Sequence, residues 1–242
     1  MNRPDRTDRG AADLALVRLL QLTDSAFPSG AYTLSHGLET LVADRVVADE
    51  SDLRDVIRVH LLARLAWSDL VVVGAAHAVA KAAAGDSGAR ITAMDRRLTA
   101  SKLAADDRRA SERVGLRLAT EVERFAPSVA LGAFLNAIRE GRSPGNAAVS
   151  FGLAGATLGA GRRETMLAAA SSSVSGLVSA GVRLGVIGHG AAQRLVSAAA
   201  QDIVAAVDRA EALDPHDLRP SAPQLEVALA RHETADVRLF VS

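Results

Sequence analysis

The stretch Ile91–Arg124, ITAMDRRLTASKLAADDRRASERVGLRLATEVER, decides the fold class. It is rich in Ala, Leu, Arg and Glu, which are among the best helix formers, and it contains no proline. Proline is also absent between Pro28 and Pro127 and between Pro144 and Pro215. Nothing in these intervals alternates with period two over the length of a strand. The sequence therefore predicts an all-α protein, a single-domain helical bundle of about eight to ten helices.

Apolar spacing and turn residues predict where the helices begin and end. We expect one helix from about Asp13, a second from about Tyr32, and a third that Ser51 caps and that continues to Lys81. Further helices are expected within 91–124 in one or two pieces, between the breaks at 126–128 and 140–146, and as one long helix from Gly190 to about Asp214.

Charge balance and cysteine content exclude several classes of protein. Lys plus Arg and Asp plus Glu both number 28, so no net field favours nucleic acid, anionic lipid or acidic substrates. The chain has no cysteine, which excludes disulfides and thiolate metal sites and fits a reducing cytosol. The opening MNRPDRTDRG mixes acids and bases with no apolar core behind it, so we interpret it as a short disordered lead and not as a signal peptide.

Two uncharged stretches, 145–161 and 165–182, approach the length that crosses a bilayer. Both are dominated by Gly, Ala and Ser, so their hydropathy is low for a lipid-facing helix, and buried helices are expected. Small residues recur at three- and four-residue spacing, which allows close helix packing, with an alanine-rich core as the alternative interpretation. They are Gly152, Gly155, Gly159, Ser172, Gly176 and Ala180.

No catalytic motif is complete in this chain. GRSPGN at 141–146 lacks the lysine of a phosphate loop, and no G-x-S-x-G elbow occurs. No two of the six histidines lie three to five residues apart, as a local zinc site would require. Asp106 and Asp107 are followed at once by two arginines, which indicates a solvated face with internal pairing.

Two other functions remain open from the residues alone. One is a helical enzyme whose site is assembled from distant side chains such as His36, Glu39 and Asp69. The other is a helical regulator that binds nucleic acid through KLAADDRRASERVGLRLA at 102–119, although the equal numbers of acids and bases argue against it.

Four stretches occur in order along the chain: LLQLTDSAFPSGAYTLSHGLET (19–40), AAVSFGLAGATLG (147–159), SAGVRLGVIGHGAAQRLV (179–196) and ARHETADVRLFVS (230–242). Together they resemble the UreF family of urease accessory proteins. The first stretch is similar to the family's amino-terminal signature, a leucine-rich helix, a Pro-x-Gly turn and a Ser-x-Gly-Leu-Glu helix. The last is similar to its carboxy-terminal motif, Arg-His-Glu-Thr followed by Arg-Leu-Phe.

The resemblance implies an all-helical, noncatalytic factor for the insertion of nickel into apo-urease in the cytoplasm. Members of the family bridge the accessory protein UreD, also called UreH, and the GTPase UreG, modulate UreG, and form homodimers. The resemblance implies no catalytic residue, no cofactor and no metal ligand in this chain, and neither nucleic acid nor a membrane as partner. The organisation then expected is a lead at 1–12, a helical domain at 13–215, and a linker and docking tail at 216–242.

Family residues carried over by resemblance fall at the ends of the chain and at one interior loop. The expected turn residues are Pro28, Gly30, Ser35, Gly37 and Glu39. The expected partner-binding residues are Arg183, Gln193 and Arg194, and in the tail Arg231, His232, Glu233, Arg238, Leu239 and Phe240. By resemblance the tail docks onto UreD, with Phe240 as its apolar anchor. Leu34 and Asp236 stand where the family commonly has tyrosine.

Overall fold

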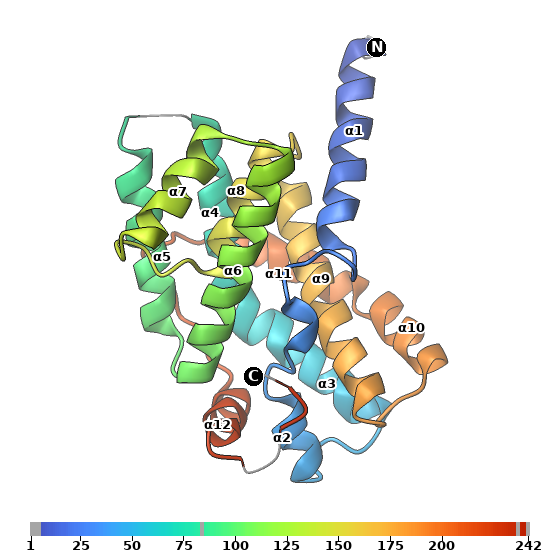
Figure 1. Cartoon of the computed structure of the whole chain (residues 1–242). Helices are drawn as coiled ribbons and strands as arrows, with labels where there is room; N and C mark the ends of the chain where they lie inside the picture. The colour runs from blue at the N-terminus through green and yellow to red at the C-terminus, as the bar shows by residue number, and fades with distance from the viewer. Residues whose placement is uncertain (1–5, 83–84, 236–237, 241–242) are drawn as a thin grey trace.

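The computed structural model describes residues 6–82, 85–235 and 238–240, and in them the chain is all-helical (Figure 1). These residues form twelve α-helices and three short helical segments, with no strand. The predicted all-α class is confirmed, and the predicted eight to ten helices are too few. The helices are α1 (Arg6–Thr23), α2 (Leu38–Ala43), α3 (Glu50–Val59), α4 (Asp69–Ala82), α5 (Ser87–Ser101), α6 (Ala105–Phe125), α7 (Val129–Arg139), α8 (Ala147–Thr157), α9 (Arg162–Arg183), α10 (His189–Ala198), α11 (Ala200–Glu211) and α12 (Pro223–His232).

Two helices that were predicted to be continuous are interrupted. After α3 the chain widens into a π-helical turn at His60–Arg64, tightens into a 3₁₀ turn at Leu65–Trp67, and starts again as α4. The hydroxyl of Ser68 donates to the carbonyl oxygen of Arg64 at 2.9 Å, which stabilises the break. The predicted long helix after Gly190 is likewise two helices, α10 and α11. These interruptions account for most of the undercounted helices.

Several helix boundaries also differ from the prediction. The first helix begins at Arg6, so residues 6–12 of the expected disordered lead are helical. Asp49, not Ser51, caps α3, because its carboxylate accepts the backbone N–H groups of Ser51 and Asp52. The second helix begins only at Leu38, since the preceding residues form a separate 3₁₀ turn and a loop. In contrast, the predicted breaks at 126–128 and 140–146 are confirmed.

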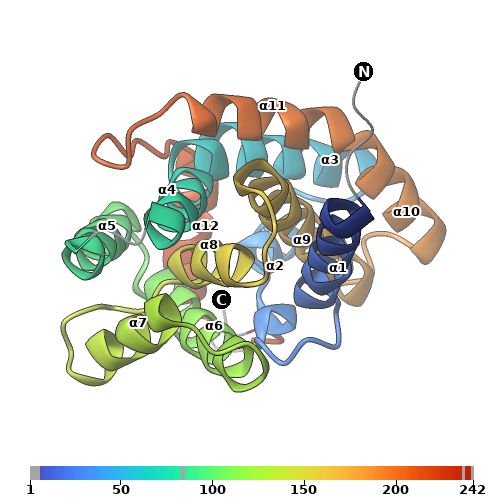
Figure 2. The same ribbon diagram turned by 90° about the horizontal axis from the view of Figure 1, so that it is seen from above.

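The core is organised around α8, which packs against α4, α6 and α9 (Figures 1 and 2). A Cβ added at Gly152 would lie 2.3 Å from the carbonyl oxygen of Val73, and one at Gly155 would lie 2.3 Å from Thr165 Oγ1. The predicted close approach is therefore confirmed at these two positions. It is wrong at Gly176, where nothing lies within 4 Å of such a Cβ.

One described helix, α9, is long and apolar enough to cross a membrane, and 44% of its most apolar window is buried inside the protein. It contacts α4, α8, α10 and α11, as a core helix of a folded domain does. Residues of the expected tail also join the fold, because α12 packs against α2 and α6 (Figure 1). A helix near the carboxy end of the chain thereby lies against α2, which belongs to its amino-terminal part.

Candidate functional site

The amino-terminal and carboxy-terminal motifs bind each other. Glu39, in the first turn of α2, accepts the backbone N–H of Leu239 at 2.6 Å through Oε1 and that of Phe240 at 3.1 Å through Oε2. Nε2 of His232, at the end of α12, lies 3.0 Å from the same Oε2. We call Glu39, His232, Phe240, Arg183, which stacks on the ring of Phe240, and Tyr32, on whose ring Arg183 also stacks, the tail clamp.

A tight turn places Glu39 beside the tail. Gly37 has φ +85°, a left-handed conformation that favours glycine, and it immediately precedes α2. A Cβ at Gly37 would lie 3.3 Å from the Cβ of Ala228 and 3.4 Å from the carbonyl oxygen of Leu225. Glycine at this position therefore lets α12 approach the start of α2. The buried Ser35 lies in the same loop.

Arg183 forms a stack at the exit of α9. Its guanidinium carbon lies 4.0 Å from the ring centroid of Tyr32 and 4.0 Å from that of Phe240, and it donates to the carbonyl oxygen of Tyr32. Cation–π contacts of this kind favour arginine over lysine because the planar guanidinium stacks on rings. Phe240 is only 3% exposed, so the residue expected to anchor the tail on a partner is buried in its own chain.

The charged residues around His232 also have partners within the chain. Glu233 Oε1 accepts the backbone N–H groups of Ala105 and Asp106, which caps the positive end of α6. Arg238 donates to Asp106 Oδ2 at 3.0 Å and to the carbonyl oxygen of Glu233 at 2.7 Å. Arg231 pairs with the carboxylate of Asp44. Arg231 and Leu239 remain exposed beside these buried contacts.

Asp106 and Asp107 do not form the solvated face that was predicted. Both are buried, and they point to different networks. Asp106 pairs with Arg109 and Arg238. Asp107 Oδ2 lies 2.6 Å from Arg64 Nη2 and 3.6 Å from Lys102 Nζ. The predicted internal pairing is confirmed for Asp106 with Arg109, whereas the predicted solvated face is wrong because both aspartates are buried and Asp107 pairs with Arg64 and Lys102.

Asp107 belongs to a buried ionic cluster made of Arg64, Asp69, Lys102, Asp107 and Glu226. Within it Arg64 Nε lies 2.9 Å from Glu226 Oε1, and Lys102 Nζ lies 2.9 Å from Asp69 Oδ1. Burial alone would raise the pKa of Asp107, but the charges of Arg64 and Lys102 outweigh it and hold that pKa below its ordinary value. The cluster therefore stays charged at neutral pH.

Two histidines lie beside the ionic cluster. The rings of His36 and His60 are 5.1 Å apart, and His60 Nε2 lies 2.9 Å from Ser173 Oγ. Burial, with Arg64 as the next cause, lowers the pKa of His36 to about 4, and burial also lowers the pKa of His60 well below its ordinary value. Both imidazoles are therefore neutral at pH 7.

A cavity of about 160 Å³ adjoins these histidines, and His36, Asp69 and Ser173 line it. Glu39 faces the tail and not this cavity, so the three residues of the enzyme alternative do not converge. Among the residues that the structure describes, no three His, Asp or Glu side chains are arranged to hold a metal ion. Lys102, a cation of the stretch in the nucleic-acid alternative, is buried in the ionic cluster and is not exposed to bind nucleic acid.

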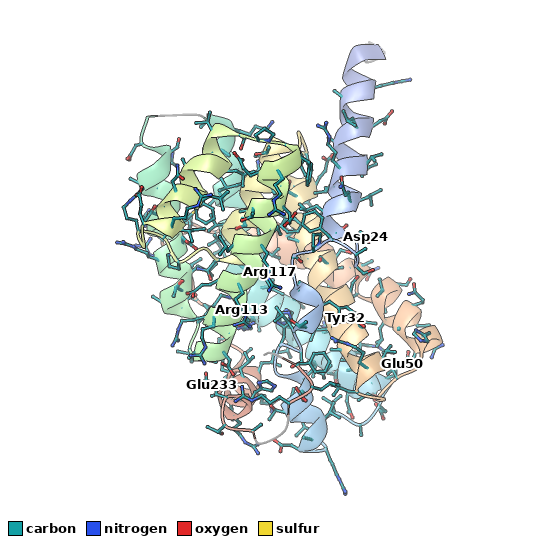
Figure 3. All side chains as sticks on the ribbon, viewed as in Figure 1. Asp24, Tyr32, Glu50, Arg113, Arg117 and Glu233 are labelled. Atoms are coloured by element: carbon teal, nitrogen blue, oxygen red, sulfur yellow. The ribbon has the colours of Figure 1, made fainter. Side chains whose placement is uncertain are left out.

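The remaining predicted residues lie apart from the tail clamp. Gln193 and Arg194 are exposed on α10, where Arg194 pairs with Glu50 at 2.7 Å (Figure 3 labels Glu50). Pro28 is exposed, and Gly30, at φ +78°, is packed closely by Arg117. Their positions do not bring them into contact with the carboxy-terminal motif.

The substituted positions have different outcomes. Leu34, where the resemblance leads us to expect a tyrosine, is buried against Ala110 and Val114 of α6. Asp236 lies outside the described residues. The sequence did not indicate that Glu39 binds the backbone of the tail. The only signal for this contact was that both end motifs carry charged residues beside glycine or aromatic residues.

The UreF family model matches residues 47–200. A urease accessory protein UreF of Arthrobacter sp. (strain FB24) is 31% identical over 96% of this chain and 99% of its own length. Proteins of the same name from Bacillus sp. (strain TB-90) and Lachnoclostridium phytofermentans are 31% and 30% identical, over 94% and 95% of this chain and 99% and 100% of their own lengths.

Proposed function

The chain belongs to the UreF family of urease accessory proteins, and we propose that it is a noncatalytic scaffold for insertion of nickel into apo-urease. In this role it bridges UreD/UreH and the GTPase UreG in the cytoplasm and modulates UreG. The observation that carries the proposal is the tail clamp, because the family's two end motifs combine there into one surface. A scaffold needs such a surface and needs no catalytic pocket of its own.

At and around the tail clamp, some residues are buried and hold the tail in place, and others are exposed and accessible to a partner. His232 and Phe240 are 1% and 3% exposed, so they fix the position of the tail. Tyr32 and Leu239 are 54% and 63% exposed, and Arg231 is also exposed. Aromatic, aliphatic and arginine side chains in this arrangement are typical of the centre of a protein interface. We assign this face to UreD/UreH (Figure 3 labels Tyr32 and Glu233).

A second exposed surface supports assembly with another chain. Leu14, Leu16, Val17 and Leu20 of α1 are at least half exposed, and α1 extends beyond the other helices (Figure 1). Leu20 also lines a groove of about 620 Å³ with Phe27 and Phe125. Contiguous apolar surface of this kind marks interaction sites. We assign it to the homodimer within the complex and leave the polar face of Gln193 and Arg194 for UreG.

Co-purification tests the assignment of the tail clamp. Tagged UreD/UreH is expected to capture the full chain, and to lose a chain that ends at Ala235, because that truncation removes Arg238, Leu239 and Phe240 but keeps α12. The matched control replaces Arg194 by Gln, which leaves the tail intact and is expected to preserve capture of UreD/UreH. Equal capture of the full and truncated chains would refute the docking assignment.

Urease activation in cells tests the function itself. A strain that lacks this gene is expected to make urease protein of low activity, and the full chain is expected to restore activity in a nickel-dependent way. If the truncated chain restored urease activity at an equal protein level, the maturation role would not depend on the tail.

A further inference from the structure

A pocket of about 300 Å³ is lined by residues of α4, α5, the start of α9 and the segment after α11, and by no residue of the tail clamp. Its floor is apolar, with alanines of α4, Val79, Met94 and Pro215. Its polar lining consists of Arg90, Arg97, Arg162 and His216, and no acidic side chain lines it. We call it the arginine pocket.

Three elements bring the arginines of the pocket together. Arg90 and Arg97 are two turns apart on α5 and share one face, and Arg162 is the first residue of α9. Gly74 of α4 makes room for Arg162, because a Cβ there would lie 3.0 Å from Arg162 Nε. The pocket is therefore built from helices and does not depend on a loop for its cations.

The arginine pocket contains unneutralised positive charge. Within the described ranges, none of its three arginines forms an ion pair, whereas the adjacent Arg163 pairs with both Asp208 and Glu211. Arg162 also stands at the amino end of a helix, where the backbone dipole is already positive. Glu164, in the same first turn, accepts the backbone N–H of Gly161 and offsets part of this positive charge.

Two histidines, His77 and His216, lie beside the arginine pocket. Burial lowers the pKa of His77, and although its hydrogen bond to Ala160 opposes this, Lys81 and Arg162 lower that pKa further. Arg97 donates to Nδ1 of His216, so this imidazole lies against an arginine of the pocket. The acids of this segment are already engaged, since Asp214 accepts the backbone N–H of His216 and Asp217 pairs with Arg219.

We propose that the arginine pocket binds a small, multiply charged oxyanion, a phosphate or polycarboxylate group whose apolar body rests on the pocket floor. Guanidinium groups match such oxygens in paired, charge-assisted hydrogen bonds. The volume is at the lower end of that of small-molecule sites, which are largely apolar with a few convergent polar groups. This site is separate from the scaffold function proposed above.

Isothermal titration of the full chain with pyrophosphate and with citrate tests the proposal. We expect saturable binding of at least one of them at one site per chain, weaker at high than at low ionic strength. Arg162→Gln, and separately Arg90→Gln with Arg97→Gln, are expected to weaken binding about tenfold or more. The matched control, Arg113→Gln with Arg139→Gln, removes two exposed arginines elsewhere and should bind as the unchanged chain does.

The outcomes separate the two chemical sources. Binding of pyrophosphate alone assigns a phosphoryl ligand, and binding of citrate alone assigns a polycarboxylate. No saturable binding of either anion, or equal weakening in the control, would overturn the proposal. Binding of an acidic peptide with neither small anion would also overturn it and assign the pocket to a protein partner. Because these arginines lie outside the tail clamp, capture of UreD/UreH by the same variants reports on the scaffold function independently.

Discussion

The ionic cluster and the tail clamp lie beside two adjacent residues of α6. The two regions hold α12 and the segment after it in different ways. Asp107 faces the cluster, where α12 contributes Glu226, and Asp106 faces the clamp region, where α12 ends in His232. In the cluster buried side chains pair with each other, whereas in the clamp one carboxylate holds backbone N–H groups and one guanidinium is stacked between rings. The cluster therefore fixes α12 to the core, and the clamp fixes the end of α12 and the short segment after it.

Arg64→Met is expected to have the largest effect on this comparison. It leaves the buried carboxylates of Asp107 and Glu226 without their shared cation, which costs about 3–5 kcal/mol in the free energy of unfolding. Urea denaturation followed by circular dichroism measures it.

The matched control for that variant is Arg109→Met. Arg109 pairs with Asp106, but its side chain is mostly exposed, so a much smaller loss than for Arg64→Met is expected. Equal losses for the two variants would mean that the cluster contributes no more than a surface ion pair.

As the pH falls, the free energy of unfolding is expected to decrease at pH values above those at which the carboxylates of the ionic cluster titrate. The pKa of His36 is about 4 in the folded chain and about 6.5 when unfolded, so the unfolded chain binds more protons between these values. Stability should therefore fall as pH drops from about 6.5 to about 4, by about 3 kcal/mol from His36. Below that window the depressed pKa values of Asp69 and Asp107 extend the loss.

His36→Gln tests this source of the pH dependence. Urea unfolding at a series of pH values should show a shallower decline between pH 6.5 and 4 for the variant than for the unchanged chain. His60 shares the window, so a residual slope is expected. An unchanged slope would show that His36 titrates normally in the folded state.

Glu39→Gln is expected to loosen the tail with less effect on the core. A carboxylate oxygen pair that accepts three N–H groups is replaced by one carbonyl oxygen, at a local cost of about 1–3 kcal/mol. Amide hydrogen exchange at Leu239 and Phe240 should accelerate about tenfold to a hundredfold. Glu50→Gln, which removes an exposed ion pair to Arg194, is the control and should leave these amides unchanged.

Arg183→Lys is expected to have the smallest effect. It keeps the charge but loses the planar stack on Tyr32 and Phe240, worth about 0.5–2 kcal/mol. Tyr32 is the only tyrosine in the chain, so near-ultraviolet circular dichroism reports its surroundings directly. Arg209→Lys, which alters a similar stack on Trp67, should leave the tyrosine signal as it is.

The all-α class and several turns could be predicted because they depend on local features. Proline spacing, helix formers and the breaks at 126–128 and 140–146 act within a few residues. The break between α3 and α4 could not be predicted. It depends on the Ser68 hydroxyl, which donates to the carbonyl oxygen of Arg64, in a stretch whose composition favours a helix throughout.

Several partners of charged residues were beyond prediction because they are distant in sequence, as Arg64 is from Asp107. Asp107 appeared to pair with its neighbouring arginines, but the fold supplies Arg64 and Lys102. Glu39 was identified with the tail residues only through family resemblance, and nothing local indicated that it binds the backbone of Leu239 and Phe240. Contacts of this kind follow from how helices pack, so composition alone does not indicate them.

Glu233 closes the amino end of α6, and this has a consequence for the order of events during synthesis. The ribosome releases α6 long before it makes Glu233, so the nascent helix has no cap from that side chain while most of the chain emerges. Glu226 and His232 arrive equally late. The surface proposed for partner docking therefore forms only after the segment from Glu226 to Phe240 has been synthesised and has packed against α2 and α6.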